Sequence, residues 1–347
     1  MTEQELSAYI QAIRPADEAA MEAARRRQAQ LAKPPGSLGQ LEEISIRLAG
    51  VTGQVCPAMG KCRVAVFAAD NGVVAEGVSC TPPAVTLQQA VNMTFRKTGM
   101  SAMAAAFGDD VSVVDVGIDG DVPPVGVLDR KVRRGTGDIA REDAMTRQQV
   151  LDAMAAGMEQ AARARADGVT ALGIGEMGIG NTTTSSAVAA VLLGQPVEVM
   201  TGRGAGLSDE GLARKIDAIH RGIAKNQPDS ADALDVLAKL GGFDIAGLCG
   251  VFLGGALEGV PVLADGFISC VAALCAVRLC PAAAKAVFAS HCSTEPAAKL
   301  VLDALNKKAL ITAGLHLGEG TGAVAAIPLW DMALSGSARR RPRLFLQ

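Results

Sequence analysis

The chain of 347 residues has few aromatic side chains and no apolar run long enough to cross a membrane. Aromatic residues make up 3% of the sequence although hydrophobic residues make up 49%, so the core must consist of Ala, Val, Leu, Ile and Met. Such a chain, which is also rich in glycine, is expected to pack helices closely onto a sheet. The longest uncharged apolar stretch, Ile245 to Leu257, is shorter than the roughly 20 residues that a bilayer requires.

Neither sign of charge predominates, because the sequence has 33 basic and 36 acidic residues and a formal net charge of −3. This balance gives no general attraction to a phosphodiester backbone, so we expect no nucleic-acid partner. We interpret the one basic run, near the C-terminal end, as a solvated tail rather than a binding patch. The run consists of Arg339, Arg340, Arg341 and Arg343.

Metal-site and export signals are absent as well. The eight cysteines form no CxxC pair and mostly have apolar neighbours, and the histidines, His220, His291 and His316, are far apart in the sequence. We therefore expect buried thiols in a reducing compartment and no metal or other cofactor. The first 27 residues carry charges throughout, unlike a signal peptide, and predict a cytoplasmic protein.

The sequence changes from a helical pattern near the N-terminus to an alternation of short apolar runs and helical segments. Residues 3–33 and 41–52 have helical spacing on either side of the breaker KPPGSLGQL. Short β-rich runs then appear at 64–70, 111–117, 169–175 and 286–291, most of them followed by helical segments. This alternation predicts an α/β fold with a mainly parallel, Rossmann-like sheet, whose ligands bind beyond the carboxyl ends of the strands.

The segment VTALGIGEMGIGNTTTSSAVAAVLLG is the most informative. Gly173, Gly175, Gly178 and Gly180 fall within eight residues, and hydroxyl residues 182–186 then open an apolar helix. Glycine amides and a helix N-terminus favour an anion, although glycines also serve tight strand-to-helix turns. Because the P-loop lysine is lacking and the dinucleotide fingerprint fits poorly, we expect a monophosphate.

A second glycine loop, TGRGAGLSDEGLARKI, precedes a helix that Ser208 or Asp209 would cap. Lys215 within that helix is either the positive charge for the first loop or an ordinary solvated lysine. In a third loop Glu319 stands between Gly318 and Gly320, just before a helix that begins near Thr321. This carboxylate is either open to a ligand or simply complements the helix N-terminus.

Weaker clusters lie at two strand ends, 70–72 and 290–293, and Asp265 before an apolar helix has the position of a cap. No Ser/His/Asp elbow and no cofactor lysine signature is found in the sequence. From the residues alone we predict an α/β enzyme that binds a small phosphorylated molecule and transfers a group by acid–base catalysis and positioning.

At these loops the chain resembles the nicotinate-nucleotide:dimethylbenzimidazole phosphoribosyltransferases of cobalamin nucleotide-loop assembly. The matching segments, in order, are KPPGSLGQLE, AADNGVVAEGVS, GIGEMGIGNTT, GRGAGLSDEGLARKI, DGFIS, SHCSTEP and LGEGTGA. The resemblance implies a small helical domain built from both termini (1–60 and 326–347) around an α/β domain (61–325), and a homodimer with sites near its interface. It also implies transfer of phosphoribose from nicotinate mononucleotide to an aromatic base, without a metal.

Residue roles come from the same resemblance. Glu319 matches the catalytic base that takes the proton of the incoming azole, and Glu176 matches a second acidic group. The residues expected to bind the substrates are Gly178, Gly180, Asn181, Thr182, Gly204, Lys215, Ser79, Gln88, Asp265, Ser293, Gly320 and Thr321.

The chain departs from the family pattern mainly where the base should bind. Asn71 replaces a usual His, Cys80-Thr81 replaces a small residue and an aromatic, and Cys292 and His316 replace arginines. The acceptor therefore stays open between dimethylbenzimidazole and a purine or phenol, and a non-catalytic subunit of a heteromer is a further alternative. Retention of Glu319 and of the 175–181 loop argues against the last.

Overall fold

The computed structural model describes residues 1–122 and 126–339, with side chains through residue 335. Its six-stranded sheet has the order β3-β2-β1-β4-β5-β6, and every neighbouring pair is parallel. The strands are β1 (Lys61–Ala69), β2 (Asp110–Gly117), β3 (Val127–Asp129), β4 (Val169–Met177), β5 (Val262–Ala264) and β6 (Val287–Ala289). The predicted Rossmann-like α/β class is confirmed, and the order reverses between β1 and β4, where such folds bind ligands.

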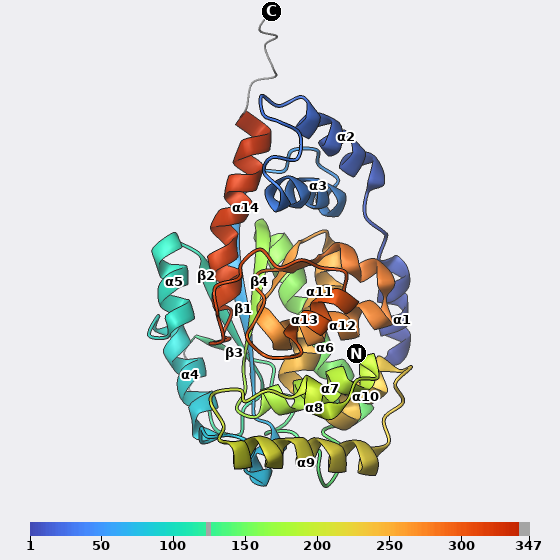
Figure 1. Cartoon of the computed structure of the whole chain (residues 1–347), viewed down its shortest axis with the longest axis vertical. Helices are drawn as coiled ribbons and strands as arrows, with labels where there is room; N and C mark the ends of the chain where they lie inside the picture. Colours follow the sequence, from blue (N-terminus) through green and yellow to red (C-terminus); the bar gives the residue numbers. More distant parts are fainter. Residues whose placement is uncertain (123–125, 340–347) are drawn as a thin grey trace, which may run out of the picture.

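Helices cover both faces of the sheet (Figure 1). Those of the first half are α1 (Glu3–Ala12), α2 (Glu18–Ala29), α3 (Gln40–Thr52), the 3-10 helix η1 (Gly72–Glu76), α4 (Ala84–Thr94), α5 (Gly99–Phe107) and α6 (Arg147–Ala166). Those of the middle are α7 (Asn181–Leu193), α8 (Val197–Met200), α9 (Asp209–Asn226), α10 (Ala233–Leu240) and α11 (Phe243–Glu258). The last are α12 (Gly266–Leu279), the 3-10 helix η2 (Pro281–Lys285), α13 (Ala298–Ala304) and α14 (Thr321–Arg339).

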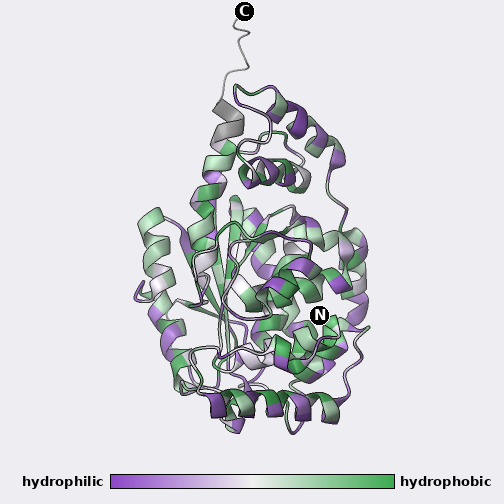
Figure 2. Ribbon diagram, viewed as in Figure 1, coloured by the Kyte–Doolittle hydropathy of each residue, from purple (hydrophilic) through white to green (hydrophobic). Residues whose placement is uncertain are grey.

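The central strands are apolar on both faces because both are covered, as in parallel sheets generally. Along β1, Ala65 and Phe67 belong to the core shared with α6, α11 and α12, whereas Val64 and Val66 belong to the core shared with α3, α5 and α14. Figure 2 shows the apolar colouring concentrated in the sheet and on the helix faces against it. None of the helices in residues 1–122 and 126–339 could span a membrane.

Helices α6 and α11 pack so closely that glycine is required at their crossing. A Cβ at Gly157 would lie 1.9 Å from the Gly247 carbonyl oxygen, and one at Gly250 would lie 2.0 Å from that of Met154. The expected close packing of a chain rich in alanine and glycine is thus found between helices as well as on the sheet.

The N-terminal helices divide between two places. Helix α1 lies against α11, with Leu6 and Ile13 in the main core, and the Met1 amino group pairs with Asp152 of α6 at 3.1 Å. Helices α2 and α3 pack on each other, and α3 contacts α14 (Figure 1). Within residues 1–60, α1 thus packs on the α/β layers, whereas α2 and α3 pack on each other. The basic run from 340 onward lies outside the described residues.

Candidate active site

A single cleft at the carboxyl ends of the strands gathers the three predicted loops. The loop after β4, the loop before α9 and the loop before α14 all contribute to its walls, together with the segment that follows η1. Ten residues selected from the sequence line it: Ser79, Glu176, Gly178, Gly180, Asn181, Thr182, Gly204, Asp265, Ser293 and Glu319. Residues far apart in the sequence thus meet in one place.

Gln88, selected as a substrate-binding residue, does not line the cleft. It is exposed on α4, whereas its neighbour Gln89 lines the cleft and donates from Nε2 to Oε1 of Glu319 at 3.3 Å. Successive residues of a helix point about 100° apart, so an error of one position removes the side chain from the site. Gly320 and Thr321 lie behind the wall, where the Thr321 hydroxyl donates to the Gly318 carbonyl oxygen at 2.8 Å.

Lys215 is fully buried behind the cleft rather than solvated. Its Nζ donates to Oγ1 of Thr182 at 2.8 Å and to the Gly202 carbonyl oxygen at 3.0 Å. Burial lowers the pKa of Lys215 to about 8, and the Glu295 carboxylate opposes that shift. Lys215 therefore places a cation one hydrogen bond behind Thr182.

The start of α7 supplies the rest of an anion site. Gly180 has a φ of 94°, which glycine adopts without strain, and α7 begins at the next residue, Asn181. Across the cleft, a Cβ at Gly204 would come within 3.0 Å of Oγ1 of Thr182. Helix N-terminal amides, a hydroxyl and a buried lysine behind it together suit one phosphate.

Glu319 is held in a left-handed backbone conformation, with φ of 62°, between Gly318 at 80° and Gly320 at 98°. Its side chain is 5% exposed, and Oε2 is buried without a hydrogen-bond partner among the described residues. Burial raises the pKa of Glu319, although interactions with Thr98, Gln89 and the Met100 backbone oppose the rise. A buried, raised carboxyl that can still accept a proton is suited to general-base catalysis.

Asp265 follows β5 and was expected to cap α12 or to bind substrate. Its side chain makes no capping hydrogen bond to α12. Instead Oδ2 accepts from the Gly320 amide and Oδ1 from the Gly322 amide, both at 2.7 Å, at the start of α14. The side chain of His291 lies beside the same carboxylate, with Nδ1 3.6 Å from Oδ1.

Glu176 and Asp244 are two buried carboxyl groups that share Asn181 as a donor, and only Glu176 was selected from the sequence. Asn181 Nδ2 donates to Oδ2 of Asp244 at 2.9 Å and also to Oε2 of Glu176. Burial and the Asp244 carboxylate raise the pKa of Glu176 to about 8, while burial raises that of Asp244 to about 6. The pair therefore retains a proton near neutral pH. Asp244 gave no signal in the sequence, because it stands inside an apolar helical segment far from the glycine loops.

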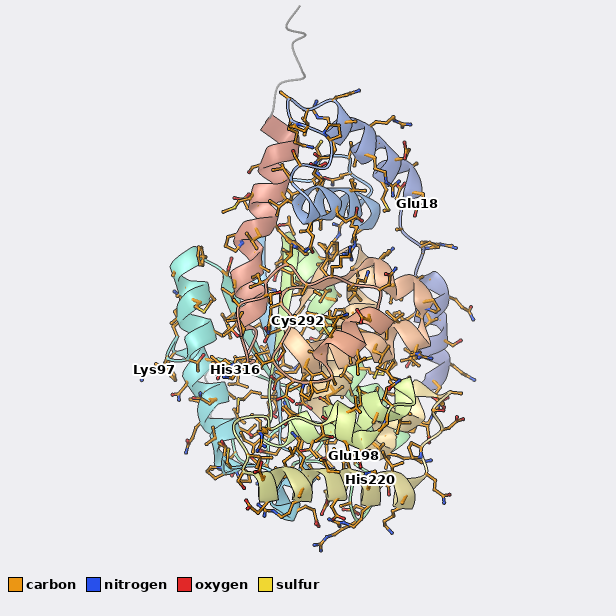
Figure 3. The ribbon with its side chains drawn as sticks, in the orientation of Figure 1. Glu18, Lys97, Glu198, His220, Cys292 and His316 are labelled. Carbon is orange, nitrogen blue, oxygen red and sulfur yellow. The ribbon has the colours of Figure 1, made fainter. Side chains whose placement is uncertain are left out.

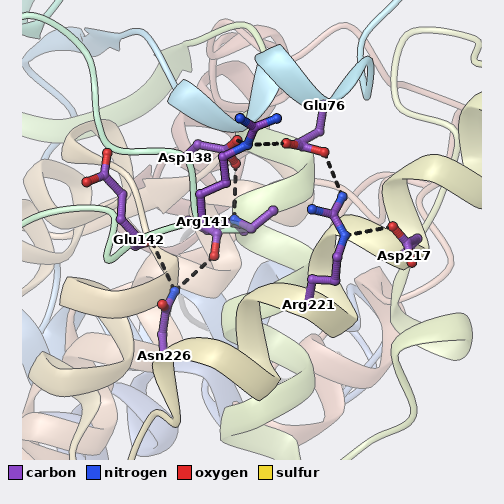
Figure 4. A network of polar contacts seen from close by, with 9 residues as sticks. Glu76, Asp138, Arg141, Glu142, Asp217, Arg221 and Asn226 are labelled. Carbon is purple, nitrogen blue, oxygen red and sulfur yellow. Dashed lines mark hydrogen bonds and ion pairs between the residues drawn. The ribbon is translucent and has the colours of Figure 1, made fainter.

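The wall formed by 78–81 is anchored by an ion-pair network shown in Figure 4. Glu76, at the end of η1, pairs with Arg221 of α9 at 2.6 Å and with Arg141 at 2.8 Å. Arg221 also pairs with Asp217 at 2.8 Å. Because α9 carries Lys215, the network fixes this wall relative to the phosphate end of the cleft.

Some of the residues that differ from the family pattern line the cleft, and others do not. Cys80, Thr81 and His316 line the cleft, whereas Asn71 and Cys292 do not. Figure 3 shows His316 on the loop that precedes α14 and Cys292 near the centre of the molecule. Five of the eight thiols are buried as expected, but Cys56 and Cys80 are exposed and Cys292 is half-buried.

In chemical terms the cleft has an anion site at one end and a buried carboxylate at the other. Within residues 1–122 and 126–339, no three His, Cys, Asp or Glu side chains are grouped as a metal site. The residues present can bind a phosphorylated ligand, accept a proton and exclude water. They fit a displacement between two bound substrates.

This doubly wound fold and site define a phosphoribosyltransferase, and a family model described as "Phosphoribosyltransferase" matches residues 13–339. The protein from Acetivibrio thermocellus named nicotinate-nucleotide–dimethylbenzimidazole phosphoribosyltransferase is 48% identical over 315 residues, covering 91% of this chain and 90% of its own. That of Chloroflexus aggregans is 47% identical over 329 residues, covering 94% and 93%. The chain belongs to the nicotinate-nucleotide:dimethylbenzimidazole phosphoribosyltransferase family.

Solved structures agree with the sequence comparison. The crystal structure of CobT from Thermus thermophilus superposes with a TM-score of 0.89 at 43% identity, covering 92% of this chain and 96% of that one. A second structure from the same organism, titled with the enzyme's full name, also has a TM-score of 0.89, at 42% identity and 94% and 97% coverage. The resemblance drawn from the loops is thereby confirmed.

Proposed function

We propose that this chain transfers the 5-phosphoribosyl group of nicotinate mononucleotide to 5,6-dimethylbenzimidazole. The products are nicotinate and α-ribazole 5′-phosphate, which provides the lower ligand of cobalamin. Family membership and the substrates in the relatives' names support this reaction. The observation that carries it is the buried Oε2 of Glu319, which accepts no hydrogen bond from the described part of the chain and lies in the same cleft as the anion site.

In the proposed reaction, a ring nitrogen of the azole attacks C1′ of the ribose from the face opposite nicotinate. The new C–N bond forms as the bond to the pyridinium nitrogen breaks, and its electron pair leaves with nicotinate. The azole becomes cationic, and its other ring nitrogen gives its proton to Glu319. The configuration at C1′ inverts from β to α.

The anion end of the cleft supplies the positioning. The amides of Gly180 and Thr182 and the Thr182 hydroxyl, with Lys215 behind it, would hold the 5′-phosphate. A fixed phosphate places C1′ at a set distance along the cleft, so that both reacting groups meet in one orientation. The buried surroundings of Glu319 keep water away from the developing charge.

The acceptor is the part of the site where this chain differs from its family. Cys80, Thr81 and His316 all line the cleft and stand where the family has other residues. A purine or a phenol is therefore the second candidate acceptor. A phenol must lose its proton before it attacks, so it would depend on Glu319 more strongly than an azole does.

The test is to incubate the purified protein with nicotinate mononucleotide and, separately, dimethylbenzimidazole, adenine and a cresol. Released nicotinate is measured by chromatography, and the new nucleotide by mass spectrometry. We expect nicotinate release that depends on the acceptor, with dimethylbenzimidazole the best of the three. No release with any base would contradict the proposed reaction, and a preference for adenine or cresol would change its acceptor.

We further propose that the protein acts as a homodimer. Within the described chain, exposed large apolar side chains gather on the α4–α5 edge, at Phe95, Met103 and Phe107. Leu317, 59% exposed on the loop before Glu319, comes close to Gly99 at the start of α5. An apolar face of this kind is typical of an interface, and it adjoins the cleft.

A further inference from the structure

We infer that Asp265 is a positioning residue, whose carboxylate clamps the backbone around Gly320 and Gly322 and so holds Glu319 in the conformation that places its side chain in the cleft. The inference goes one step past the proposed function and relies on it only for the reaction that Glu319 serves. It concerns how this chain maintains a strained residue at the centre of its site.

The backbone of residues 318–320 is unusual because three successive residues have a positive φ. Glycine adopts this region freely, but Glu319 lies between two glycines and has a side chain. A residue with a Cβ avoids this region unless its surroundings hold it there, and such residues occur preferentially at functional sites. Something outside the loop must therefore fix the conformation.

Asp265 provides that fixation from the neighbouring strand. Its side chain, with the residue only 4% exposed, accepts one backbone hydrogen bond on each oxygen, both at 2.7 Å. The two donors, Gly320 and Gly322, flank the first residue of α14, and Gly320 immediately follows Glu319. One rigid side chain thus fixes two peptide planes next to the strained residue.

Strand β4 closes the other side of the loop. A Cβ at Gly175 would lie 2.4 Å from the carbonyl carbon and oxygen of Glu319, so the loop backbone lies directly on that strand. A Cβ at Gly322 would lie 1.9 Å from Nδ1 of His291. The loop is therefore held between a glycine of β4 and the Asp265–His291 pair.

Because Asp265 also lines the cleft, a direct contact with the substrate is the competing explanation. The two explanations predict different kinetics. A positioning residue lowers kcat when it is changed and leaves the KM for nicotinate mononucleotide nearly unaltered. A substrate contact raises that KM.

The first experiment measures both constants for Asp265→Asn, which keeps the shape but accepts only one of the two amide hydrogen bonds. We expect kcat to fall by about 10–100-fold, since displacement of a catalytic group by about 1 Å has effects of this size. The KM for nicotinate mononucleotide should stay within about threefold. A rise in KM with kcat unchanged would overturn the inference.

The matched control is Asp115→Asn. Asp115 also follows the apolar part of a strand, is 1% exposed, and accepts from the amides of Gly117 at 3.0 Å and Ile118 at 2.8 Å. It does not line the cleft. Asn keeps Oδ1 and both amide hydrogen bonds but loses the ion pair of Oδ2 with Lys131 at 3.2 Å, so this variant should lose stability yet keep kcat and KM within about threefold.

The second experiment needs no turnover and compares melting temperatures. Asp265→Asn is introduced into the wild type, into Glu319→Gln and into Glu319→Gly. Glutamine removes the charge and keeps the backbone strain, whereas glycine removes both. We expect a clearly smaller fall in Tm in the Gln background than in the Gly background, because only the strained loop gains by relaxing once the clamp is weakened.

Equal falls in the Gln and Gly backgrounds would show that Asp265 does not hold the strained residue, and would overturn the inference. If the wild type releases no nicotinate, the proposed reaction fails, while the melting comparison still decides whether the clamp exists. Failure of the clamp and failure of the reaction are thus separated.

Discussion

At the scale of single residues, Glu319 combines backbone strain with a strong local restraint. A left-handed residue with a side chain costs about 1–3 kcal/mol. Each hydrogen bond to an ionised carboxylate contributes about 1.5–3 kcal/mol, and Asp265 makes two of them beside this residue. The restraint is therefore large enough to hold the strained conformation before any substrate binds.

The same residue gives the most direct catalytic prediction. Glu319→Gln keeps the shape and removes the proton acceptor, so both substrates should bind almost normally. A positioned base contributes about 10²–10⁴-fold, so kcat with dimethylbenzimidazole should fall within that range. Steady-state kinetics at several pH values measure the loss. If kcat stays within about threefold, Glu319 is not the base, and Glu176 becomes the next residue to replace.

Glu176 gives a prediction about stability and pH. Its pKa is raised to about 8 from an ordinary value of 4.5, so between these values the folded protein keeps a proton that the unfolded chain releases. Stability contributed by this group is therefore full below pH 4.5 and falls as pH rises toward 8. Glu176→Gln cannot ionise and keeps an acceptor for Asn181.

We therefore expect Glu176→Gln to raise stability over the wild type more at pH 8.5 than at pH 5. At about 1.4 kcal/mol per pKa unit, the difference should exceed roughly 1 kcal/mol. Denaturant unfolding at the two pH values measures it. Glu18→Gln, at an exposed position on α2, is the control. An equal effect of Glu176→Gln at both pH values would show that Glu176 is ionised throughout.

The sequence predicted the glycine loops and Glu319 well, because glycine spacing reports a local backbone requirement. It did not predict contacts made across the fold. Gln89 faces Glu319 because of the orientation of α4 about its own axis. Asp244 hydrogen-bonds with Asn181 from a helix more than 60 residues further along the sequence. For Lys215 the sequence left burial and solvation open, since burial is decided by what packs around a helix. The catalytic and binding roles of these residues stay predictions.

At the scale of elements, α14 begins directly against β4 because that strand has no side chains there. Gly173 and Gly175 are two residues apart and face α14 together. A Cβ at Gly173 would lie 3.1 Å from that of Ala323, a tight but adjustable contact. One at Gly175 would meet the Glu319 backbone itself, which cannot move away without moving the carboxylate.

Gly175→Ala should therefore lower kcat by about tenfold or more, through displacement of Glu319. Gly173→Ala, on the same face of the same strand, should cost some stability and leave kcat within about threefold. Kinetics and thermal unfolding of both variants make the comparison. Equal kcat losses in the two would mean that general damage to β4, rather than contact with Glu319, is the cause.

The longer strands were the easiest to recognise in the sequence. The runs at 64–70, 111–117 and 169–175 correspond to β1, β2 and β4, and the run at 286–291 contains β6. Strands β3, β5 and β6 have three residues each, too few to show a period, and only β6 lies within a longer apolar run that the sequence displays. Helix α1 has the same helical pattern as α2, so the sequence assigned both to the annex. Contacts made across the fold, among them those of Leu6, Ile13 and the Met1 amino group, place α1 on the α/β layers.

At the scale of the whole molecule, the apolar α4–α5 edge predicts self-association. Light scattering should report a dimer for the wild type. Phe107→Asp, at a side chain 61% exposed, should shift it toward the monomer and lower activity at high dilution. Val199→Asp, at another exposed apolar position on α8, should do neither. A fully active monomeric wild type would rule out both the dimer and its part in the site.

Helix α14 begins two residues after Glu319, and its far part packs against α3 in the annex. Its 19 residues span about 28 Å, and Trp330, fully buried along it, packs edge-on against Phe288 at 4.7 Å. One helix, with Pro328 inside it, therefore connects the loop of Glu319 to the annex. We expect substitutions in the face of α3 that packs on α14 to alter kcat as well as stability, although no residue of α3 lines the cleft.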